Sequence, residues 1–123
     1  MRDLLARKVR VVDPVTGGAK EQSIVRHDLM PSGPLSFVAA VFGYGATKYD
    51  VHNWRRGYPW SLSSAALMRH LHAWLDGEDV DEESGLPHLA HAVAHCLFLM
   101  EFDAIHPDGD DRWRPPEPEP PPY

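Results

Sequence analysis

A run of prolines at the C-terminal end limits how much of this chain can form a packed core. Seven of its twelve prolines lie from Pro107 onward, and the last residues read Arg114-Pro115-Pro116-Glu117-Pro118-Glu119-Pro120-Pro121-Pro122-Tyr123. Such a stretch buries little apolar surface, so residues 107–123 are predicted to be a disordered, extended tail. About 105 residues remain to fold, which suits one domain with a modest core.

Apolar residues recur at spacings of three and four in three segments, 34–49, 61–76 and 86–104. That period places the apolar residues of each segment on one face of a helix. The predicted fold class is therefore all-α: a small bundle of about three main helices, formed by residues 27–106.

Turn residues mark the ends of these helices. Gly77 can end the second helix, and Pro87 is tolerated only in the first turn of the third. Residues 1–26 are predicted to form an N-terminal arm, which is either a β-hairpin turning at 13–18 or an ordered arm without regular structure.

Charge and cysteine content narrow the class of partner. The net charge is −6 and no basic run occurs, so nucleic acid is not an expected partner. No apolar run approaches the ~18 residues of a membrane span, so no membrane partner is expected. The single cysteine, Cys96, lies in an apolar run and is expected to be a buried, inert thiol in a reducing compartment. These features predict a cytoplasmic protein.

The most unusual segment is an acidic segment at residues 76–83, which holds six of the eighteen acidic residues. Like charges this close repel one another, and hard oxygen ligands suit Mg²⁺ or Mn²⁺. If the backbone is helical there, Glu78 pairs with Asp81 and Asp79 with Glu82 on one face. Glu83 could provide a further oxygen ligand for the metal. The alternative is a solvated acidic loop between two helices.

Histidines lie on both sides of the acidic segment. His70, His88 and His91 could ligate Mn²⁺, act as a general base or orient a water molecule. The alternative is that they pack between helices and bond to the backbone or to the acids. For His95, deeper in the third apolar segment, the packing role is favoured. A Zn²⁺ site is less expected, because acidic residues far outnumber histidines here.

Residues 45–57 carry the cationic and aromatic groups that a nucleotide would need. Lys48 and Arg55 can neutralise phosphate oxygens, Trp54 can stack on a base, and Asn53 can read a base edge. The alternative is an inter-helix loop whose aromatic residues anchor it to the core. The dipeptide His27-Asp28, found in HD-type phosphohydrolases, is too short to indicate that fold.

Several motifs together resemble one known family. They are Arg26-His27-Asp28-Leu29-Met30-Pro31, Gly45-Ala46-Thr47-Lys48-Tyr49-Asp50, Asn53-Trp54-Arg55-Arg56-Gly57, Arg69-His70-Leu71, and Gly77-Glu78-Asp79-Val80-Asp81-Glu82-Glu83-Ser84-Gly85 with His88 and His91. In this order they resemble the phage-type dATP/dGTP diphosphohydrolase domain, a family common in bacteriophages and related to the MazG-like all-α nucleotide pyrophosphohydrolases. The match covers about residues 16–103.

This resemblance implies hydrolysis of purine deoxynucleoside triphosphates, dGTP or dATP, to the monophosphate and pyrophosphate. It also implies a Mg²⁺ or Mn²⁺ cofactor and a homo-oligomer, a dimer or a tetramer. MazG-like enzymes hold the metal with paired carboxylates, often E-x-x-E on one helix and E-x-x-D on another. This chain has Glu78-x-x-Asp81 but no clean E-x-x-E on an earlier helix. The ligands are therefore either rearranged around residues 78–91 or completed by a partner subunit.

Residues 27–106 are thus expected to be a helical catalytic domain. The expected metal ligands are Glu78, Asp81 and Glu83, with Asp79 and Glu82 in reserve. The expected catalytic residues are Glu78, His70, His88 and His91. The expected substrate-binding residues are Lys48, Asn53, Trp54, Arg55 and Arg69. The alternatives are a non-catalytic regulator that binds a nucleotide or a metal, and a structural α-helical protein whose acidic segment faces solvent.

Overall fold

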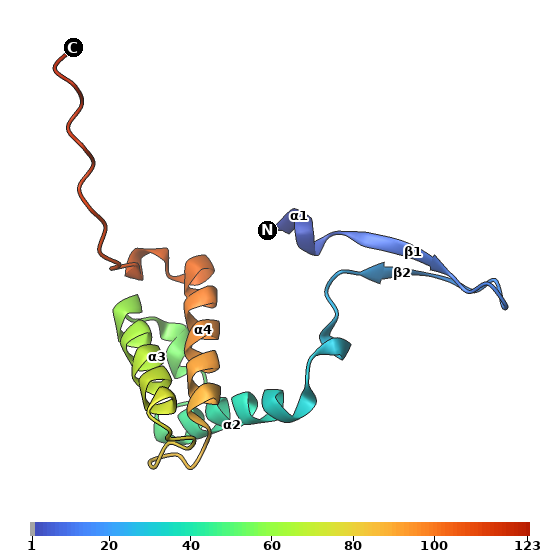
Figure 1. Cartoon of the computed structure of the whole chain (residues 1–123), viewed down its shortest axis with the longest axis horizontal. Coiled ribbons are helices and arrows are strands. Elements are labelled where there is room, and N and C mark those ends of the chain that lie inside the picture. The colour runs from blue at the N-terminus through green and yellow to red at the C-terminus, as the bar shows by residue number, and fades with distance from the viewer. Residues whose placement is uncertain (1) are drawn as a thin grey trace. The chain divides into compact units, whose positions relative to one another are not determined.

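The computed structural model describes residues 2–123, which divide into two compact units, Met1–Ser32 and Gly33–Tyr123. The first unit contains a short helix, α1 (Arg2–Leu5), two strands, β1 (Lys8–Val12) and β2 (Ala19–Ser23), and a 3₁₀ turn, η1 (His27–Leu29). Figure 1 shows each element with its label.

The strands form an antiparallel hairpin, paired from Lys8 with Ser23 to Val12 with Ala19. Local turn chemistry closes the hairpin. The Asp13 side chain accepts hydrogen bonds from the amides of Val15 and Thr16, both at 2.8 Å. The prediction of an all-α fold is therefore wrong: the described chain is a mixed α/β protein with a two-stranded sheet.

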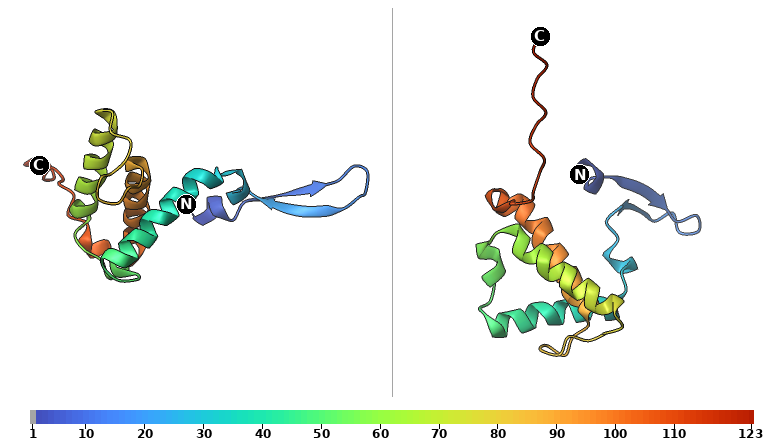
Figure 2. Two further views of the ribbon diagram at one scale, coloured as in Figure 1. Left: turned by 90° about the horizontal axis from the view of Figure 1, so that it is seen from below. Right: turned by 60° about the vertical axis from the view of Figure 1, so that its left-hand side comes forward.

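The second unit is helical. Its elements are α2 (Ser32–Lys48), which begins at the boundary, η2 (Asn53–Arg56), α3 (Trp60–Leu75), α4 (His88–Ile105) and η3 (Pro107–Gly109). The helices α3 and α4 run side by side in opposite directions, and Figure 2 shows the same pairing from two other directions. This pairing leaves the acidic segment in the loop that joins them.

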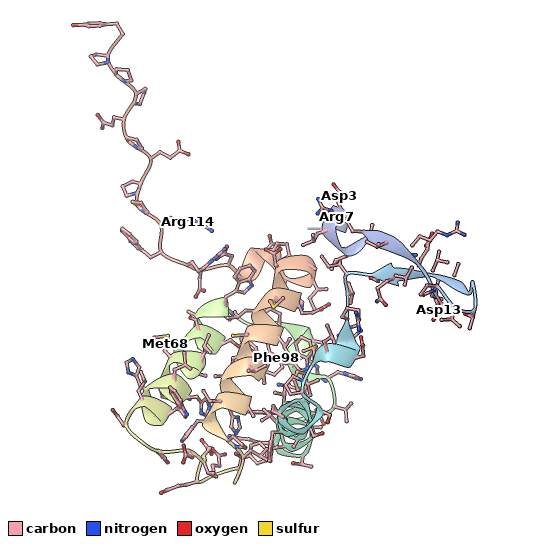
Figure 3. All side chains as sticks on the ribbon, turned by 45° about the vertical axis from the view of Figure 1, so that its right-hand side comes forward. Asp3, Arg7, Asp13, Met68, Phe98 and Arg114 are labelled. Carbon is pink, nitrogen blue, oxygen red and sulfur yellow. The ribbon has the colours of Figure 1, made fainter. Side chains whose placement is uncertain are left out.

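The core of this unit lies where α2 packs on α4. Its buried residues are Val38, Val41, Ala90 and Ala94, and Phe42, Leu86 and Phe98 pack against them. In Figure 3, Phe98 lies among the helices, whereas Met68 on α3 points outward.

Gly77 ends α3 as its sequence predicts. The glycine has φ +94°, and its amide bonds to the carbonyl of Trp74 while the amide of Glu78 bonds to that of Ala73, both at 3.0 Å. This is the Schellman arrangement, which satisfies the last carbonyls of a helix. The chain then turns instead of continuing as a helix.

The loop before α4 is closed by backbone hydrogen bonds. The Asp81 amide donates to the carbonyl of Leu86 at 2.9 Å, and the Gly85 amide donates to the carbonyl of Asp81 at 2.8 Å. The amide of His88 donates to Asp79 at 2.9 Å. The segment is not helical, so the pairs spaced by three residues do not share a helix face.

Residues that follow α4 form hydrogen bonds with the first residues of α3. The Trp60 indole donates to the carbonyl of His106 at 3.1 Å, and the Ser61 amide donates to Asp111 Oδ1 at 2.9 Å. The Asp111 carboxylate thereby caps an amide of the first turn of α3. Residues 110–123 contain no helix or strand, and the chain leads away from the helices after the contacts of Asp111 and Arg112 with the start of α3 (Figure 1).

Two further findings bear on the sequence predictions. Cys96 is exposed, not buried, because it lies on the outer side of α4. Among residues 2–123, no helix combines the length and the apolar character needed to cross a bilayer.

Candidate metal and nucleotide site

A cavity of about 1000 Å³ lies within the helical unit. Its walls come from the second half of α2, the segment between α2 and η2, the facing sides of α3 and α4, and the loop that joins them. The polar residues that line it include Lys48, Asp50, His52, Asn53, Arg69, His70, Asp81, Glu83, His88, His91 and His95. Ligand cavities of this size commonly combine apolar walls with a few convergent polar groups.

Four histidines gather on one side of this cavity and form a histidine cluster: His70, His88, His91 and His95. The spacing along α4 puts its three members on one face, and His70 on α3 meets them. The rings of His70 and His91 are stacked, with centroids 4.5 Å apart and planes 8° from parallel. The His95 ring lies 6.2 Å from that of His70.

Two of these histidines come together with one carboxylate. His70 Nδ1 lies 2.8 Å from His88 Nδ1 and 3.9 Å from Asp81 Oδ2. The three residues can each offer a ligand atom within 4.8 Å of the others. Nitrogen and oxygen donors at this separation fit one divalent metal ion.

His88 provides a second sign that the cluster is built for a ligand. The residue is 5% exposed, and its Nε2 atom has no hydrogen-bond partner. The nearest carboxylate oxygen, Glu78 Oε1, lies 3.5 Å away, at ion-pair distance but without hydrogen-bond geometry. A buried polar atom without a partner is rare, and it marks places where structures hold an ion, a water or a functional group.

Three of these histidines, His70, His91 and His95, have a lowered pKa and are held in their neutral form. Burial, and then the neighbouring His91, lowers the pKa of His70 to about 4. Burial also lowers the pKa of His95 to about 4, aided by His70, and lowers that of His91 despite the opposing charge of Asp81. Neutral imidazoles keep a lone pair that can bind a metal or accept a proton.

Asp81 stays ionised inside the cavity wall. Burial opposes its charge, but the amide of Ser84, which donates to Asp81 Oδ1 at 3.0 Å, and the nearby His91 outweigh burial and lower its pKa. The Ser84 hydroxyl also lies 2.7 Å from His91 Nε2. Asp81 and His91 are therefore both fixed by the same turn.

Of the predicted acidic ligands, the structure brings Asp81 and Glu83 to the cavity. Glu83 forms an ion pair with Lys48 at 2.6 Å, and this contact, together with the Tyr44 hydroxyl, lowers its pKa. The remaining three are Glu78, Asp79 and Glu82, which are exposed and lie outside the cavity lining. The segment thus presents one face to the cavity and the other to solvent.

Of the predicted substrate-binding residues, Lys48, Asn53, Trp54 and Arg69 line the cavity, and Arg55 does not. The guanidinium of Arg55 lies 4.6 Å from the Trp54 ring centre. Trp54 stacks on Phe98 at 4.8 Å. One face of the indole is thus occupied by the core.

A buried hydrogen-bonded chain behind the histidine cluster was not predicted. The Ser63 hydroxyl is fully buried and lies 2.6 Å from the Tyr58 hydroxyl and 3.0 Å from His95 Nδ1. It fixes the orientation of the His95 ring. The only sign in the sequence is the seven-residue spacing between His88 and His95, which puts them on one helix face.

Replacing Ser63 by alanine should lower the free energy of unfolding by about 1–3 kcal/mol, because the buried partners of the hydroxyl lose their hydrogen bonds. Urea unfolding followed by circular dichroism measures this change. Ser64, its exposed neighbour, provides the matched control: Ser64→Ala should shift stability by less than about 0.5 kcal/mol. Equal effects of both changes would show that the buried chain stabilises nothing.

Comparisons with known proteins show which family this sequence resembles. The sequence model of one family, described as dATP/dGTP diphosphohydrolase, N-terminal, matches residues 14–112. A protein of Salmonella phage PMBT28, called dATP/dGTP diphosphohydrolase, is 35% identical over 75 residues, which are 61% of this chain. The matched segment spans 26% of that relative, about a quarter of its length. No solved structure matches.

Proposed function

This chain belongs to the dATP/dGTP diphosphohydrolase N-terminal family, and from that membership we propose that it hydrolyses dATP and dGTP to the monophosphate and pyrophosphate. The observation that supports the proposal is that donor atoms suited to a metal ion and cationic side chains line the same cavity. A cluster of metal-binding donors, His70, His88 and Asp81, lies there together with the cations Lys48 and Arg69. A triphosphate needs both kinds of group.

We propose a divalent ion, Mg²⁺ or Mn²⁺, as cofactor, held by Asp81 with His70 and His88. When bound, the ion neutralises charge on the phosphate oxygens and acidifies a water molecule. The 2.8 Å distance between His70 Nδ1 and His88 Nδ1, with Asp81 Oδ2 3.9 Å from the first of them, supports this assignment.

The other cavity residues bind and orient the substrate. Lys48 and Arg69 attract phosphate oxygens, and Glu83 holds the Lys48 ammonium in place until the nucleotide arrives. His91 is kept neutral, and its Nε2 atom lies 2.7 Å from the Ser84 hydroxyl; in the tautomer whose Nε2–H donates to Ser84, Nδ1 can accept a proton from the attacking water. Asn53 offers an amide that can pair with a purine edge.

The direct test uses the purified chain. It is incubated with each of the four dNTPs and Mg²⁺ or Mn²⁺, and pyrophosphate is measured. We expect release from dATP and dGTP and little from dCTP or dTTP, and release should stop on chelation of the metal. Thermal stabilisation by a dNTP without any product would instead support the non-catalytic regulator.

Replacing Lys48 by glutamine should raise KM for the nucleotide by about tenfold, because a charged hydrogen bond to phosphate contributes about 1.5–3 kcal/mol. The melting temperature should change little, since the pair with Glu83 is exposed. Lys20→Gln, on the exposed strand β2, removes the same charge away from the cavity and should leave KM unchanged. If both variants raise KM equally, Lys48 does not bind the substrate.

We also propose that the protein acts as a homo-oligomer in the cytoplasm, which is that of the host if a phage encodes the protein. One side of α4 exposes the apolar residues Leu89, Val93, Leu97 and Met100. An exposed apolar stripe of this kind commonly marks a contact with another chain. Light scattering coupled to size-exclusion chromatography measures the oligomer size, and a monomer at working concentration would contradict this part.

A further inference from the structure

The donor set at the cavity differs from the all-carboxylate set that the acidic segment suggests. We propose that His70, His88 and Asp81 form a site of two histidines and one carboxylate that binds Mn²⁺, Co²⁺ or Zn²⁺ in preference to Mg²⁺, with Glu78 acting on it through His88. That the bound ion serves as a cofactor rests on the proposed function. That the site binds the ion does not depend on that function.

The first argument is the distance between the two imidazoles. His70 Nδ1 and His88 Nδ1 face each other at 2.8 Å, and Asp81 Oδ2 lies 3.9 Å from the first of them. Two nitrogens that bind one ion at ~2.1 Å stand ~3.0–3.4 Å apart, depending on the coordination angle. The rings therefore need to separate only slightly to hold an ion between them.

The second argument is the kind of donor. Of the acidic segment, Asp81 alone reaches the two histidines closely enough to share an ion with them. Mg²⁺ takes oxygen ligands and keeps several waters, whereas imidazole suits softer divalent ions. Two nitrogens and one oxygen therefore favour Mn²⁺, Co²⁺ or Zn²⁺, and the three protein ligands leave positions open for a phosphate.

The third argument assigns a role to Glu78. If His88 binds an ion through Nδ1, its proton must reside on Nε2, the buried atom that has no partner in the ion-free protein. Glu78 Oε1 already lies 3.5 Å from that atom. A small movement would make the hydrogen bond from a metal-bound histidine to a carboxylate that fixes the ring and raises its basicity. Glu78 is then a positioning residue and not a ligand.

The test measures metal binding without nucleotide. The full chain, stripped of metal, is titrated calorimetrically with Mn²⁺, Co²⁺ and Mg²⁺. We expect Mn²⁺ and Co²⁺ to bind at least tenfold more tightly than Mg²⁺. Pulsed electron paramagnetic resonance of the Mn²⁺-loaded wild-type chain should show coupling to ¹⁴N. Equal affinity for Mg²⁺, or the absence of nitrogen coupling, would overturn the proposal without relying on any variant that might misfold.

Two variants test the role of Glu78. Glu78→Gln should weaken Mn²⁺ binding by about 10–100-fold, the usual effect of losing a partner of a metal-bound histidine, while the ¹⁴N coupling persists. Asp76→Asn removes one charge from the same acidic segment, outside the cavity lining, and should change Mn²⁺ affinity less than twofold. Equal losses in both variants would mean that Glu78 acts only through overall charge and would contradict its positioning role.

The results separate this inference from the proposed function. Nucleotide cleavage supported by Mg²⁺ without nitrogen coupling would overturn the two-histidine site and leave the activity standing. Tight Mn²⁺ binding through nitrogen in a chain that cleaves no dNTP would establish the site and overturn the activity.

Discussion

Asp81→Asn should lower the rate of dATP or dGTP cleavage at least about 100-fold and leave the fold intact. The carboxylate is the anionic donor beside His70 and His88 in the cavity, and losing even a residue that only supports a metal ligand costs about 10–100-fold. Asparagine keeps the volume and an oxygen that can still accept the amide of Ser84. The turn should therefore survive the loss of charge.

Steady-state kinetics measures this effect, and circular dichroism checks the fold. Asp76→Asn is the matched control, because it makes the same chemical change in the acidic segment at an exposed position outside the cavity lining. Its rate should stay within about twofold of the wild type. An Asp81→Asn protein that retains full activity would exclude Asp81 from the chemistry.

Phe102→Ala should reduce the free energy of unfolding by about 3–5 kcal/mol. The Phe102 side chain is fully buried, and its ring meets those of Tyr58 at 5.1 Å, His106 at 5.7 Å and Trp54 at 6.2 Å. Truncation would leave a cavity between η2, α4 and the segment that follows α4. Small domains are stable by only about 5–15 kcal/mol, so this one change removes a large share of that stability.

The melting temperature should fall by roughly 10 °C or more, as expected for a domain of this size. Glu101→Ala, at the preceding exposed position of α4, provides the control and should shift the free energy of unfolding by less than about 0.5 kcal/mol. A similar melting temperature for wild type and Phe102→Ala would mean that this aromatic contact is not part of the stabilising core.

The helix ends could be predicted because their signals are local. Gly77 supplies the positive φ that the Schellman arrangement needs, and Pro87 immediately precedes α4. The sequence does not decide between a hairpin and an irregular arm at residues 1–26, because the strands lack such a local signal. Almost every residue of β1 and β2 is exposed, so no apolar face marks the strands, and the turn at Asp13 fixes the pairing.

The candidate site was only partly predictable. The acidic segment pointed to a metal, but the helical spacing drawn from it assumed a backbone that the turn at Asp81 does not adopt. The apolar surroundings of His95 in the sequence favour a packing role, and they cannot show that Ser63 on another helix orients its ring. The proximity of His70 to His88 depends on the crossing of α3 and α4, which periodicity alone does not define.

The loop between α3 and α4 also has a consequence for how the molecule folds. His70 and His88 are 18 positions apart, and their contact closes through the loop of residues 76–87. Contacts of low sequence separation form early, because closing a short chain segment loses little entropy. The histidine cluster should therefore assemble as an early helical hairpin, before α2 docks, and its amides should be protected early in pulse-labelling hydrogen exchange during refolding.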